Sequence, residues 1–423
     1  MPPFLCPVIV DIVGSSMSAM PLPLAPPISE TAPPDLDFLL SEEKIGPRDG
    51  AGKTVVVAMS GGVDSATTAL IMRERGYRVV GMNLRLFSPA DPEHSVNPCC
   101  GIPAMDDARA TCALIGVPFY AVNMETEFGE AVVNRFVDEY AAGRTPNPCL
   151  ECNRHVKFRH LVHRAKLLGA DCLATGHYAR VVPGDPATGE PHRLFRAVDA
   201  RKDQSYVLHT MTQEQLGFVR FPLGNLTKPE VRALARGFGL PVAEKAESQE
   251  ICFVGKGSYA DFVARRRPDV TVPGEIVDAN GTVLGEHRGL VHHTIGQRKG
   301  IDIPHRKPQP LYVLKLEPDR NRLVVGSRAE ATARQLRADA VAMTDGAWSQ
   351  APFACDAVVR YRGTPFAAEV ALGPEGSGEA TVVFTGETHP IAAPGQAVVF
   401  YRGDEVLGGG TIGNVTSGNV SSG

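Results

Sequence analysis

The sequence predicts an α/β fold, with a doubly wound parallel sheet followed by a small central β module and a C-terminal β-barrel. Two observations lead to this prediction. From Thr54 to Leu168, short β-branched runs alternate with helical patterns, an order typical of parallel sheets. Beyond Pro273, short β-rich runs separated by glycine, Asn-Gly and Asp/Pro turns continue to the end. The 423 residues suffice for two or three domains with a large core.

Residues 1–52 differ from the rest in being rich in proline, serine and acidic side chains. The prolines oppose helix, so we expect a disordered N-terminal extension. Phe4 to Val13 is largely apolar but lacks a basic n-region and a small-residue cleavage site, so it is not interpreted as a signal peptide. The sequence contains no apolar run long enough to span a bilayer, and we expect no membrane association.

The first predicted domain covers residues 53–256, including a helical stretch from Thr212 to Gly239. Its expected strands are Thr54–Met59, Arg78–Leu84, Pro118–Val122 and Asp171–Ala174. The helices between and after them are expected near Ser65–Arg75, Met105–Ile115, Ala131–Ala142 and Asn153–Leu168. Gly76, Gly116 and Gly169 suit the left-handed position after a helix. Ligands of such sheets bind beyond the carboxyl ends of the strands.

The turn after the first strand is the strongest candidate for a nucleotide site. Its glycines let a ligand approach the backbone, and the following helix N-terminus favours an anion. Asp64 suits a phosphate site if Mg²⁺ bridges carboxylate and phosphate oxygens, so we expect a Mg-nucleotide. The alternative is an ordinary helix-capping turn. The candidate nucleotide-binding residues are Ala58, Met59, Ser60, Gly61, Gly62, Val63, Asp64 and Ser65, with Leu84 and Gly176 flanking the base or ribose.

The remaining residues are assigned to a central β module over 257–322 and a barrel over 323–423. The barrel strands are expected to include Ala357–Tyr361, Ala380–Phe384 and Ala397–Tyr401. The formal net charge of −4 excludes a uniformly basic protein, although basic stripes such as Arg154 to Lys166 could serve nucleic acid or be a solvated helix face.

Nine cysteines without a dense framework indicate a reducing compartment, so we expect a cytoplasmic protein. Cys112 and Cys172 lie in predicted core elements and read as small buried hydrophobes. Cys149, Cys152 and Cys252 instead lie in polar segments. Cys152 approaches a basic helix, where the dipole and nearby cations favour a thiolate. These three are the candidates for chemistry or metal binding.

The nucleotide loop resembles the PP-loop of the ATP pyrophosphatase superfamily, which has an adenine nucleotide alpha hydrolase-like fold. Further motifs extend the resemblance to the bacterial tRNA-specific 2-thiouridylase (MnmA) family, over roughly residues 53–415. The motifs, in order, are Ala58–Ser65, Arg144–Pro148 followed by Cys152–Asn153 and Lys157–Phe158, Ala174–Tyr178, Lys202–Tyr206, Ile251–Phe253 and Thr294–Gly300.

This resemblance implies sulfur insertion at C2 of the wobble uridine of tRNA. In that family ATP adenylates the C2 oxygen, and a persulfide sulfur then displaces AMP. By motif match, Cys252 carries the persulfide, while Cys152 is the nucleophile that releases the sulfur and closes a transient Cys152–Cys252 disulfide. A persulfide sulfur-donor protein is implied as a partner, and we expect a monomer.

Cys149 departs from family members that have aspartate there, which puts a general acid/base role in doubt. The substitution creates a Cys149-x-x-Cys152 pair. Together with Cys252, this gives three soft ligands able to hold a [4Fe-4S] cluster. The persulfide and cluster routes stay open as alternatives, with the persulfide route favoured.

The resemblance also implies contacts with tRNA. Chemistry at C2 requires the uridine base to be flipped out of the anticodon stack. Arg360 and Tyr361 resemble a second contact, with a β-strand pair and a core tyrosine as the alternative. The candidate tRNA-binding residues are Asn147, Pro148, Cys149, Lys202, Asp203, Gln204, Arg360 and Tyr361.

Two other function classes were weighed. An amidating synthetase would use the same loop but needs a glutaminase or ammonia channel, of which the sequence shows no signature. An iron-sulfur or RNA-binding module with a vestigial loop is disfavoured because Ser60 to Ser65 is intact.

Overall fold

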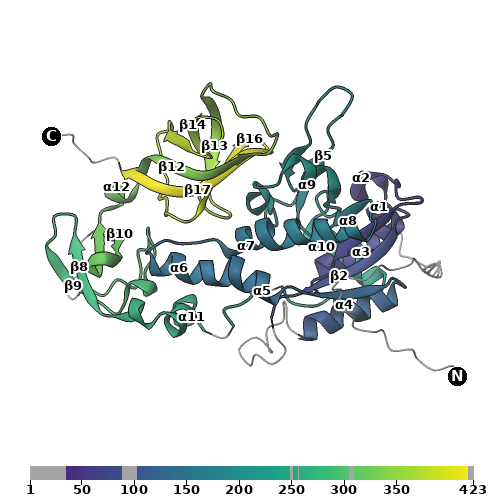
Figure 1. Ribbon diagram of the computed structural model, residues 1–423, viewed down its shortest axis with the longest axis horizontal. Helices are drawn as coiled ribbons and strands as arrows, with labels where there is room; N and C mark the ends of the chain where they lie inside the picture. Colours follow the sequence, from purple (N-terminus) through teal and green to yellow (C-terminus); the bar gives the residue numbers. More distant parts are fainter. Residues whose placement is uncertain (1–34, 88–101, 248–250, 256, 304–308, 418–423) are drawn as a thin grey trace.

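The computed structural model describes residues 35–87, 102–247, 251–255, 257–303 and 309–417. Figure 1 shows an elongated molecule with a helix-covered sheet at one end, a small module at the other and a barrel above the connecting helices. The expectations for Phe4 to Val13 and for the N-terminal prolines lie outside these ranges. Among the described residues, no helix is both long and apolar enough to cross a membrane.

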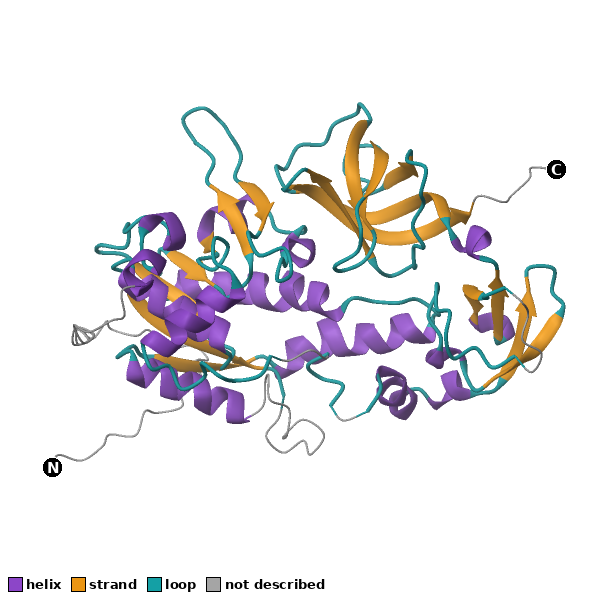
Figure 2. Ribbon diagram, turned by 180° about the vertical axis from the view of Figure 1, so that it is seen from behind, coloured by secondary structure: helices purple, strands orange, loops and turns teal. Residues whose placement is uncertain are grey.

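The first sheet is parallel and has the strand order β3–β2–β1–β4–β7. The side chains of β1 alternate between two cores, with Val55 and Val57 packing on one face and Val56 on the other. Helices therefore cover both faces, as Figure 2 shows, and the predicted doubly wound fold is confirmed. The strands are β1 (Thr54–Ala58), β2 (Arg78–Arg85), β3 (Phe119–Asn123), β4 (Cys172–Ala174) and β7 (Val219–Arg220).

One face of the sheet carries α3 (Val63–Glu74) and α4 (Ile102–Leu114). The other carries two composite helices. The first runs through α5 (Glu125–Phe128), η1 (Gly129–Asn134) and α6 (Arg135–Ala141), and the second through α7 (Pro148–Glu151), η2 (Cys152–Leu161) and α8 (Val162–Leu167). Gly76, Gly116 and Gly169 follow helices with positive φ, as predicted.

The second composite helix begins earlier than predicted, at Pro148 and not at Asn153. Asn147 has extended backbone angles, and its side-chain oxygen accepts a hydrogen bond from Leu150 N at 3.3 Å. With proline at the first helical position, this is a favourable helix start. Cys149 therefore lies in the first turn, whereas Cys152 lies one turn further on.

The predicted helical stretch from Thr212 to Gly239 is wrong in its middle. It divides into α9 (Gln213–Phe218), the short strand β7 and α10 (Lys228–Gly237). Phe221–Pro222–Leu223–Gly224 cannot continue a helix, because proline lacks the required N–H group. The start of α10 is well defined, since Thr227 and Glu230 form a capping box.

The expectation of disorder is wrong for residues 35–52. This segment forms α1 (Asp35–Leu39) and α2 (Glu42–Ile45), and it buries Leu36, Leu39 and Ile45. Proline density ends at Pro34, apart from Pro47, so the sequence beyond it retains enough apolar side chains to pack. The segment is held by residues far away in the sequence, mainly on α10.

The central module has a four-stranded sheet with the order β10–β11–β8–β9. Its helices and strands are α11 (Tyr259–Arg266), η4 (Pro268–Thr271), β8 (Gly274–Asp278), β9 (Val283–His287), η5 (Leu290–His292), β10 (Tyr312–Glu317), η6 (Pro318–Arg320) and β11 (Arg322–Gly326). Ile276, Val313 and Leu323 form its small core.

The C-terminal strands close into an antiparallel barrel, because β12 pairs with both β15 and β17. Its elements are α12 (Arg328–Ala331), β12 (Ala333–Met343), β13 (Phe353–Val358), β14 (Phe366–Leu372), β15 (Ala380–Phe384), β16 (Ala397–Arg402) and β17 (Glu405–Ser417). The predicted strand Ala357–Tyr361 ends at Val358, which leaves Tyr361 in a turn.

The barrel docks on the first domain through a hairpin of β5 (Ala179–Val182) and β6 (Arg193–Arg196), since β6 pairs with β17. Tyr206, in η3 (Ser205–Leu208), donates to Ala397 O at 2.8 Å. Gln396 donates to Thr145 O at 3.0 Å, close to the Asn147 helix start. The barrel is thereby held over the segment that leads to the cysteines.

Candidate active site

The predicted nucleotide loop joins β1 to α3 at the carboxyl edge of the sheet. Ser65 Oγ accepts from Ser60 N at 3.1 Å and donates to Gly62 O at 3.0 Å, which closes the loop on itself. Gly61 has φ +73°, and a Cβ there would lie 1.9 Å from Ala104 O. Only glycine fits this position, so α4 and the loop approach each other as closely as their backbones allow.

Gly176 lies against the same loop. A Cβ on Gly176 would lie 3.0 Å from the carbonyl carbon of Asp64 and 3.1 Å from Ser65 N. Leu84 lies near the carboxyl end of β2 and is half-buried, while its neighbour Asn83 donates to Met59 O at 2.7 Å. The structure therefore brings Gly176 to the loop, and places Leu84 at the same sheet edge.

Asp64 is the centre of a partly buried polar cluster that the sequence does not predict. Its Oδ1 accepts from Tyr178 Oη at 2.8 Å and from Lys228 Nζ at 2.6 Å. The Lys228 side chain is only 9% exposed and also pairs with Glu247 at 2.9 Å. Burial and then the Asp64 charge raise the pKa of Tyr178, so its hydroxyl remains a donor. A cation is thus fixed at the nucleotide loop.

A sequence signal for Lys228 did exist. The dipole of α10 disfavours a lysine at its first position, so a buried lysine there needs acidic partners. The segment Thr227–Lys228–Pro229–Glu230 also has the residue types of a helix start, with a threonine N-cap followed by proline and glutamate. Its partners lie 164 residues before it, at Asp64, and 19 residues after it, at Glu247.

Lys245 also contacts the nucleotide loop. Its ammonium donates to Gly61 O at 3.0 Å and to Asp107 Oδ2 at 2.6 Å. Lys245 and Glu247 belong to the same short segment after α10, and they contact the loop and Lys228 respectively. The chain that leads toward Cys252 is therefore held against the nucleotide loop.

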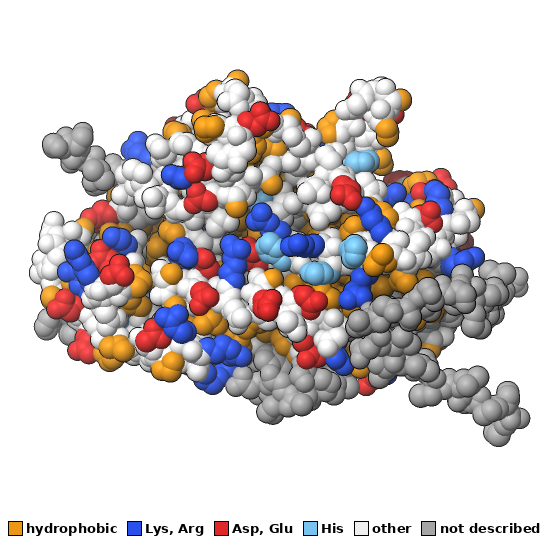
Figure 3. Space-filling model, in the orientation of Figure 1, with side chains coloured by type: hydrophobic (Ala, Val, Ile, Leu, Met, Phe, Trp, Pro, Cys, Tyr) orange, Lys and Arg blue, Asp and Glu red, His pale blue; other side chains and the backbone are white. Residues whose placement is uncertain are grey.

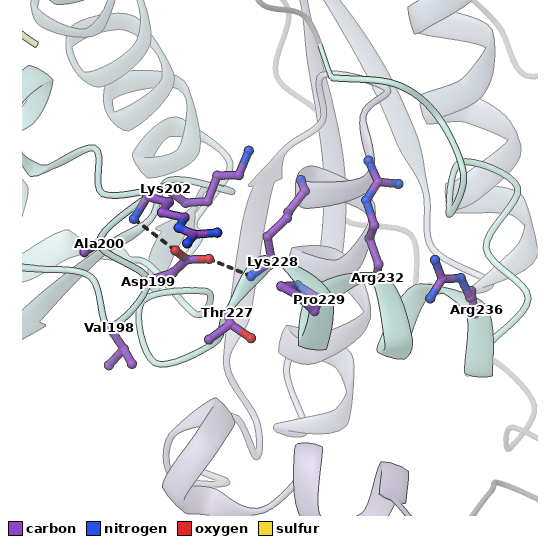
Figure 4. A pocket seen from close by; sticks show the side chains of 10 residues that line it. Val198, Asp199, Ala200, Lys202, Thr227, Lys228, Pro229, Arg232 and Arg236 are labelled. Atoms are coloured by element: carbon purple, nitrogen blue, oxygen red, sulfur yellow. Dashed lines mark hydrogen bonds between the residues drawn. The ribbon is translucent and has the colours of Figure 1, made fainter. Parts of the chain in front are cut away.

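A cavity of about 700 Å³ opens beside Lys228, between the 198–202 loop and the first turns of α10. Figure 4 shows Lys202, Lys228, Arg232 and Arg236 around it, with Asp199 bonded to the start of α10. Asp199 Oδ2 accepts from Lys228 N at 2.9 Å. Five of the ten lining residues are Lys or Arg, residue types that suit phosphate groups.

The predicted contacts Lys202, Asp203 and Gln204 differ in what they offer. Lys202 lines the cavity and pairs with Glu247. Asp203 is 9% exposed and accepts from Ala197 N at 3.0 Å and Ser205 Oγ at 2.8 Å. Gln204 accepts from Tyr178 N at 3.0 Å. Lys202 is therefore available beside the cavity, whereas the other two side chains hold their loop in place.

Asn147, Pro148 and Cys149 lie at the start of α7, near the barrel. Cys149 is exposed and Pro148 is buried. Burial raises the pKa of Tyr361. The Arg362 guanidinium opposes this rise, while the charges of Asp203 and Cys149 add to it. Tyr361 is 37% exposed, its ring centroid lies 6.0 Å from that of Tyr206, and Arg360 is exposed. Tyr361 thus lies exposed on the barrel, within electrostatic range of Cys149, and the core-tyrosine alternative is wrong.

The two candidate catalytic cysteines border one apolar cluster. Cys152 belongs to it and is 7% exposed, while the half-buried Cys252 packs against it. Phe253 anchors the Cys252 segment, with ring centroids 5.0 Å from Phe136 and 5.8 Å from Phe128. In the part of the chain that the structure describes, no three His, Cys, Asp or Glu side chains are grouped to hold a metal ion.

The face beneath the barrel carries a band of Lys, Arg and His side chains, as Figure 3 shows. On η2, the helix segment that also carries Cys152, none of Arg154, His155, Arg159 and His160 is buried. Burial and neighbouring arginines lower the pKa of His155, although Glu151 opposes this. Arg154 and Arg159 therefore place positive charge on the same helix segment as Cys152.

Three family models match consecutive parts of the chain: a tRNA methyl transferase HUP domain over residues 53–256, a tRNA methyl transferase PRC-barrel domain over 260–327 and an aminomethyltransferase beta-barrel domain over 333–412. A tRNA-specific 2-thiouridylase MnmA from Geobacter metallireducens is 47% identical over 373 residues, covering 86% of this chain and 97% of that protein. The chain belongs to the MnmA family. The MnmA of Heliobacterium modesticaldum is 46% identical over 361 residues, covering 85% and 92% of the two chains.

Solved structures similar to this MnmA-family chain are more distant. The U34-tRNA thiolase NcsA from Methanococcus maripaludis, with its [4Fe-4S] cluster, has 16% identity and a TM-score of 0.33, covering 56% of this chain and 71% of that one. A 4-thiouridine synthetase in complex with RNA and ATP has 16% identity and a TM-score of 0.30, covering 52% and 51%.

In this MnmA-family chain, the contacts of Glu247 predict an acid-dependent stability. Burial would raise the pKa of Glu247, but hydrogen bonds and charges from Lys202 and Lys228 lower it from 4.5 to about 2. The carboxylate therefore stabilises the fold above pH 4.5 and loses this contribution as the pH falls toward 2. Urea unfolding of Glu247→Gln should show a shallower loss of stability over this interval than wild type. Equal slopes for the two proteins would contradict the ion-pair assignment.

Proposed function

We propose that this chain catalyses ATP-dependent 2-thiolation of the wobble uridine, position 34, of tRNA, forming 2-thiouridine. The observation that carries the proposal is the contact between Asp64 and Lys228 at the nucleotide loop. The same domain contains the apolar cluster against which Cys152 and Cys252 lie. Membership of the MnmA family supports the substrate and the reaction.

The nucleotide step is the adenylation of the uridine C2 oxygen, with pyrophosphate as the leaving group. The residues from Ala58 to Ser65 offer backbone N–H groups and the N-terminus of α3 to the phosphates. Lys228 supplies a positive charge that opposes the charge developing on pyrophosphate. Leu84 and Gly176 flank the base or ribose. Adenylation of the C2 oxygen makes the C2 carbon, otherwise a poor electrophile, reactive toward sulfur.

Asp64 fits a role in Mg²⁺ binding only in part. Its Oδ1 accepts hydrogen bonds from Lys228 and Tyr178, whereas its Oδ2 accepts none from the residues that the structure describes. Oδ2 is therefore the oxygen that would hold the ion. Bound Mg²⁺ would neutralise phosphate charge next to the loop. Lys228 and Tyr178 would keep the carboxylate oriented toward the phosphates.

The sulfur step uses a persulfide on Cys252. Its terminal sulfur attacks C2, and AMP leaves with the electron pair of the broken C2–O bond. The Cys152 thiolate then attacks Cys252 Sγ, breaks the S–S bond and releases the sulfur on C2. This closes a Cys152–Cys252 disulfide, which two external thiol groups reduce through a mixed disulfide, supplying two electrons and becoming a disulfide themselves. A persulfide-bearing donor protein would reload Cys252.

The tRNA would bind along the basic band beneath the barrel. We place the flipped uridine at Asn147, Pro148 and Cys149, where Tyr361 offers an adjacent stacking face and Arg360 a phosphate contact. Lys202 would contact the tRNA backbone from the side of the cavity, while Asp203 and Gln204 hold in place the loop that carries Lys202. We also propose a monomer located in the cytoplasm; nine cysteines without a dense framework support the location.

A [4Fe-4S] cluster on Cys149, Cys152 and Cys252 fits the structure less well. Cys149 is exposed and Cys152 buried, and the described residues contain no metal-binding group of this kind. Protein purified without oxygen is therefore expected to be colourless, free of stoichiometric iron and sulfide, and active. Activity that rises with bound iron and disappears on chelation would overturn the persulfide route.

The function is tested with purified protein, ATP, Mg²⁺, a persulfide source and an unmodified tRNA transcript. Mass spectrometry of the digested nucleosides should show 2-thiouridine, with one pyrophosphate released per thiolated tRNA. A matched transcript with cytidine at position 34 should remain unmodified. Pyrophosphate release with incorporation of nitrogen in place of sulfur would support an amidating synthetase and contradict the proposal.

A further inference from the structure

Residues 35–50 form an N-terminal strap that lies outside the family models, the first of which starts at residue 53. Leu36, Leu39 and Ile45 of the strap pack in one cluster with Val231 and Leu234 of α10 and Ile71 of α3. Leu36 lies against α10 so closely that a Cβ on Gly237 would be 2.2 Å from its Cδ1. Figure 1 shows α1 and α2 at the end of the molecule that carries the parallel sheet.

The strap makes a polar contact at the first turn of α10. Lys44 Nζ pairs with Glu230 Oε1 at 2.7 Å, and the two side chains are 19% and 23% exposed. The other carboxylate oxygen, Oε2, accepts from Thr227 N at 2.6 Å and from Thr227 Oγ1 at 2.9 Å. Glu230 therefore connects Lys44 to the residue that immediately precedes Lys228.

A second contact lies at the end of α3. Asp49 Oδ1 accepts from Arg75 at 2.8 Å and from Tyr77 Oη at 2.9 Å, and Pro47 O accepts from Arg75 Nε at 2.9 Å. Arg75 is buried and caps α3, the helix that starts in the nucleotide loop. The strap thus holds both helices that supply the Asp64–Lys228 pair.

We propose that the strap positions the nucleotide site, with Lys44 as a positioning residue that fixes the first turn of α10 so that Lys228 reaches Asp64. The inference rests on the proposed role of Lys228 at the triphosphate. Lys44 itself bonds Glu230 and not Asp64, so its effect passes through the helix. Because the Lys44–Glu230 pair is partly shielded from water, its loss should be measurable at the loop.

Lys44→Met keeps the apolar stem and removes the charge. We expect the Kd for a non-hydrolysable ATP analogue, and the KM for ATP, to rise about three- to tenfold, the effect of one partly buried ion pair. The KM for tRNA should remain unchanged. Lys44→Arg should restore nucleotide affinity, and Lys53→Met, at an exposed lysine close by, should have no effect.

Thermal unfolding of the same variants separates positioning from general stability. An unchanged analogue Kd in Lys44→Met would overturn the proposal. So would parallel increases in the KM values for ATP and tRNA accompanied by a large fall in Tm. The analogue Kd does not depend on thiolation, so a wild-type protein that fails to form 2-thiouridine would contradict the proposed function without deciding the role of the strap.

Discussion

Cys252→Ser is expected to lower 2-thiouridine formation by at least about 10³-fold, because a serine hydroxyl cannot carry a sulfane sulfur. The Cys252 segment is anchored by Phe253 in the aromatic cluster, so the change from sulfur to oxygen should leave the fold intact. Binding of tRNA and tRNA-dependent release of pyrophosphate should both persist. Nucleoside mass spectrometry and a pyrophosphate assay on the same samples check the two halves of this expectation.

The control is Cys355→Ser. Cys355 lies on β13 of the barrel and is a free, half-buried cysteine, so its replacement should not affect thiolation. Cys152→Ser should lose turnover for a different reason, since the sulfur on C2 can no longer be released by a neighbouring thiolate. Full thiolation by Cys252→Ser would end the assignment of the persulfide to this residue.

Lys228→Met should lower kcat/KM for ATP by about 10²- to 10³-fold, the range found when a group that opposes transition-state charge is removed. The variant also leaves Asp64 and Glu247 without their shared buried cation. Pyrophosphate release in the presence of tRNA measures the loss. The defect should be larger in kcat than in tRNA affinity, because Lys228 acts on the leaving group.

Lys228→Arg retains the charge and should recover part of the activity, although a guanidinium does not reproduce the geometry of an ammonium. Lys315→Met serves as the matched control, because Lys315 forms an exposed ion pair with Glu317 in the central module. If Lys228→Met releases pyrophosphate at the wild-type rate, Lys228 has no part in the nucleotide step.

The sheet and the nucleotide loop were predictable because their signals are local. Val55, Val56 and Val57 form a buried strand, and the glycines after it permit the turn that Gly61 makes at φ +73°. The barrel was predictable from the turn residues between its strands. The start of α7 could also have been predicted from the sequence, since Asn147 and Pro148 have the residue types of a helix start.

The Asp64 cluster was not predictable in the same way, because it depends on tertiary structure. Lys228 and Asp64 meet only once α10 and α3 are packed together. The fold of residues 35–50 likewise depends on α10, since helices of four or five residues are unstable alone. Asp203 lies in a motif that predicts tRNA contact, yet its carboxylate accepts hydrogen bonds from Ala197 N and Ser205 Oγ.

A single-turnover reaction tests the central claim most directly. Protein loaded with a labelled persulfide is mixed with ATP and tRNA without reductant, and both products are analysed by mass spectrometry. The account predicts labelled 2-thiouridine and a Cys152–Cys252 disulfide that accumulate together in equal amounts. Labelled 2-thiouridine formed while both cysteines remain reduced, or a disulfide formed without it, would contradict the account.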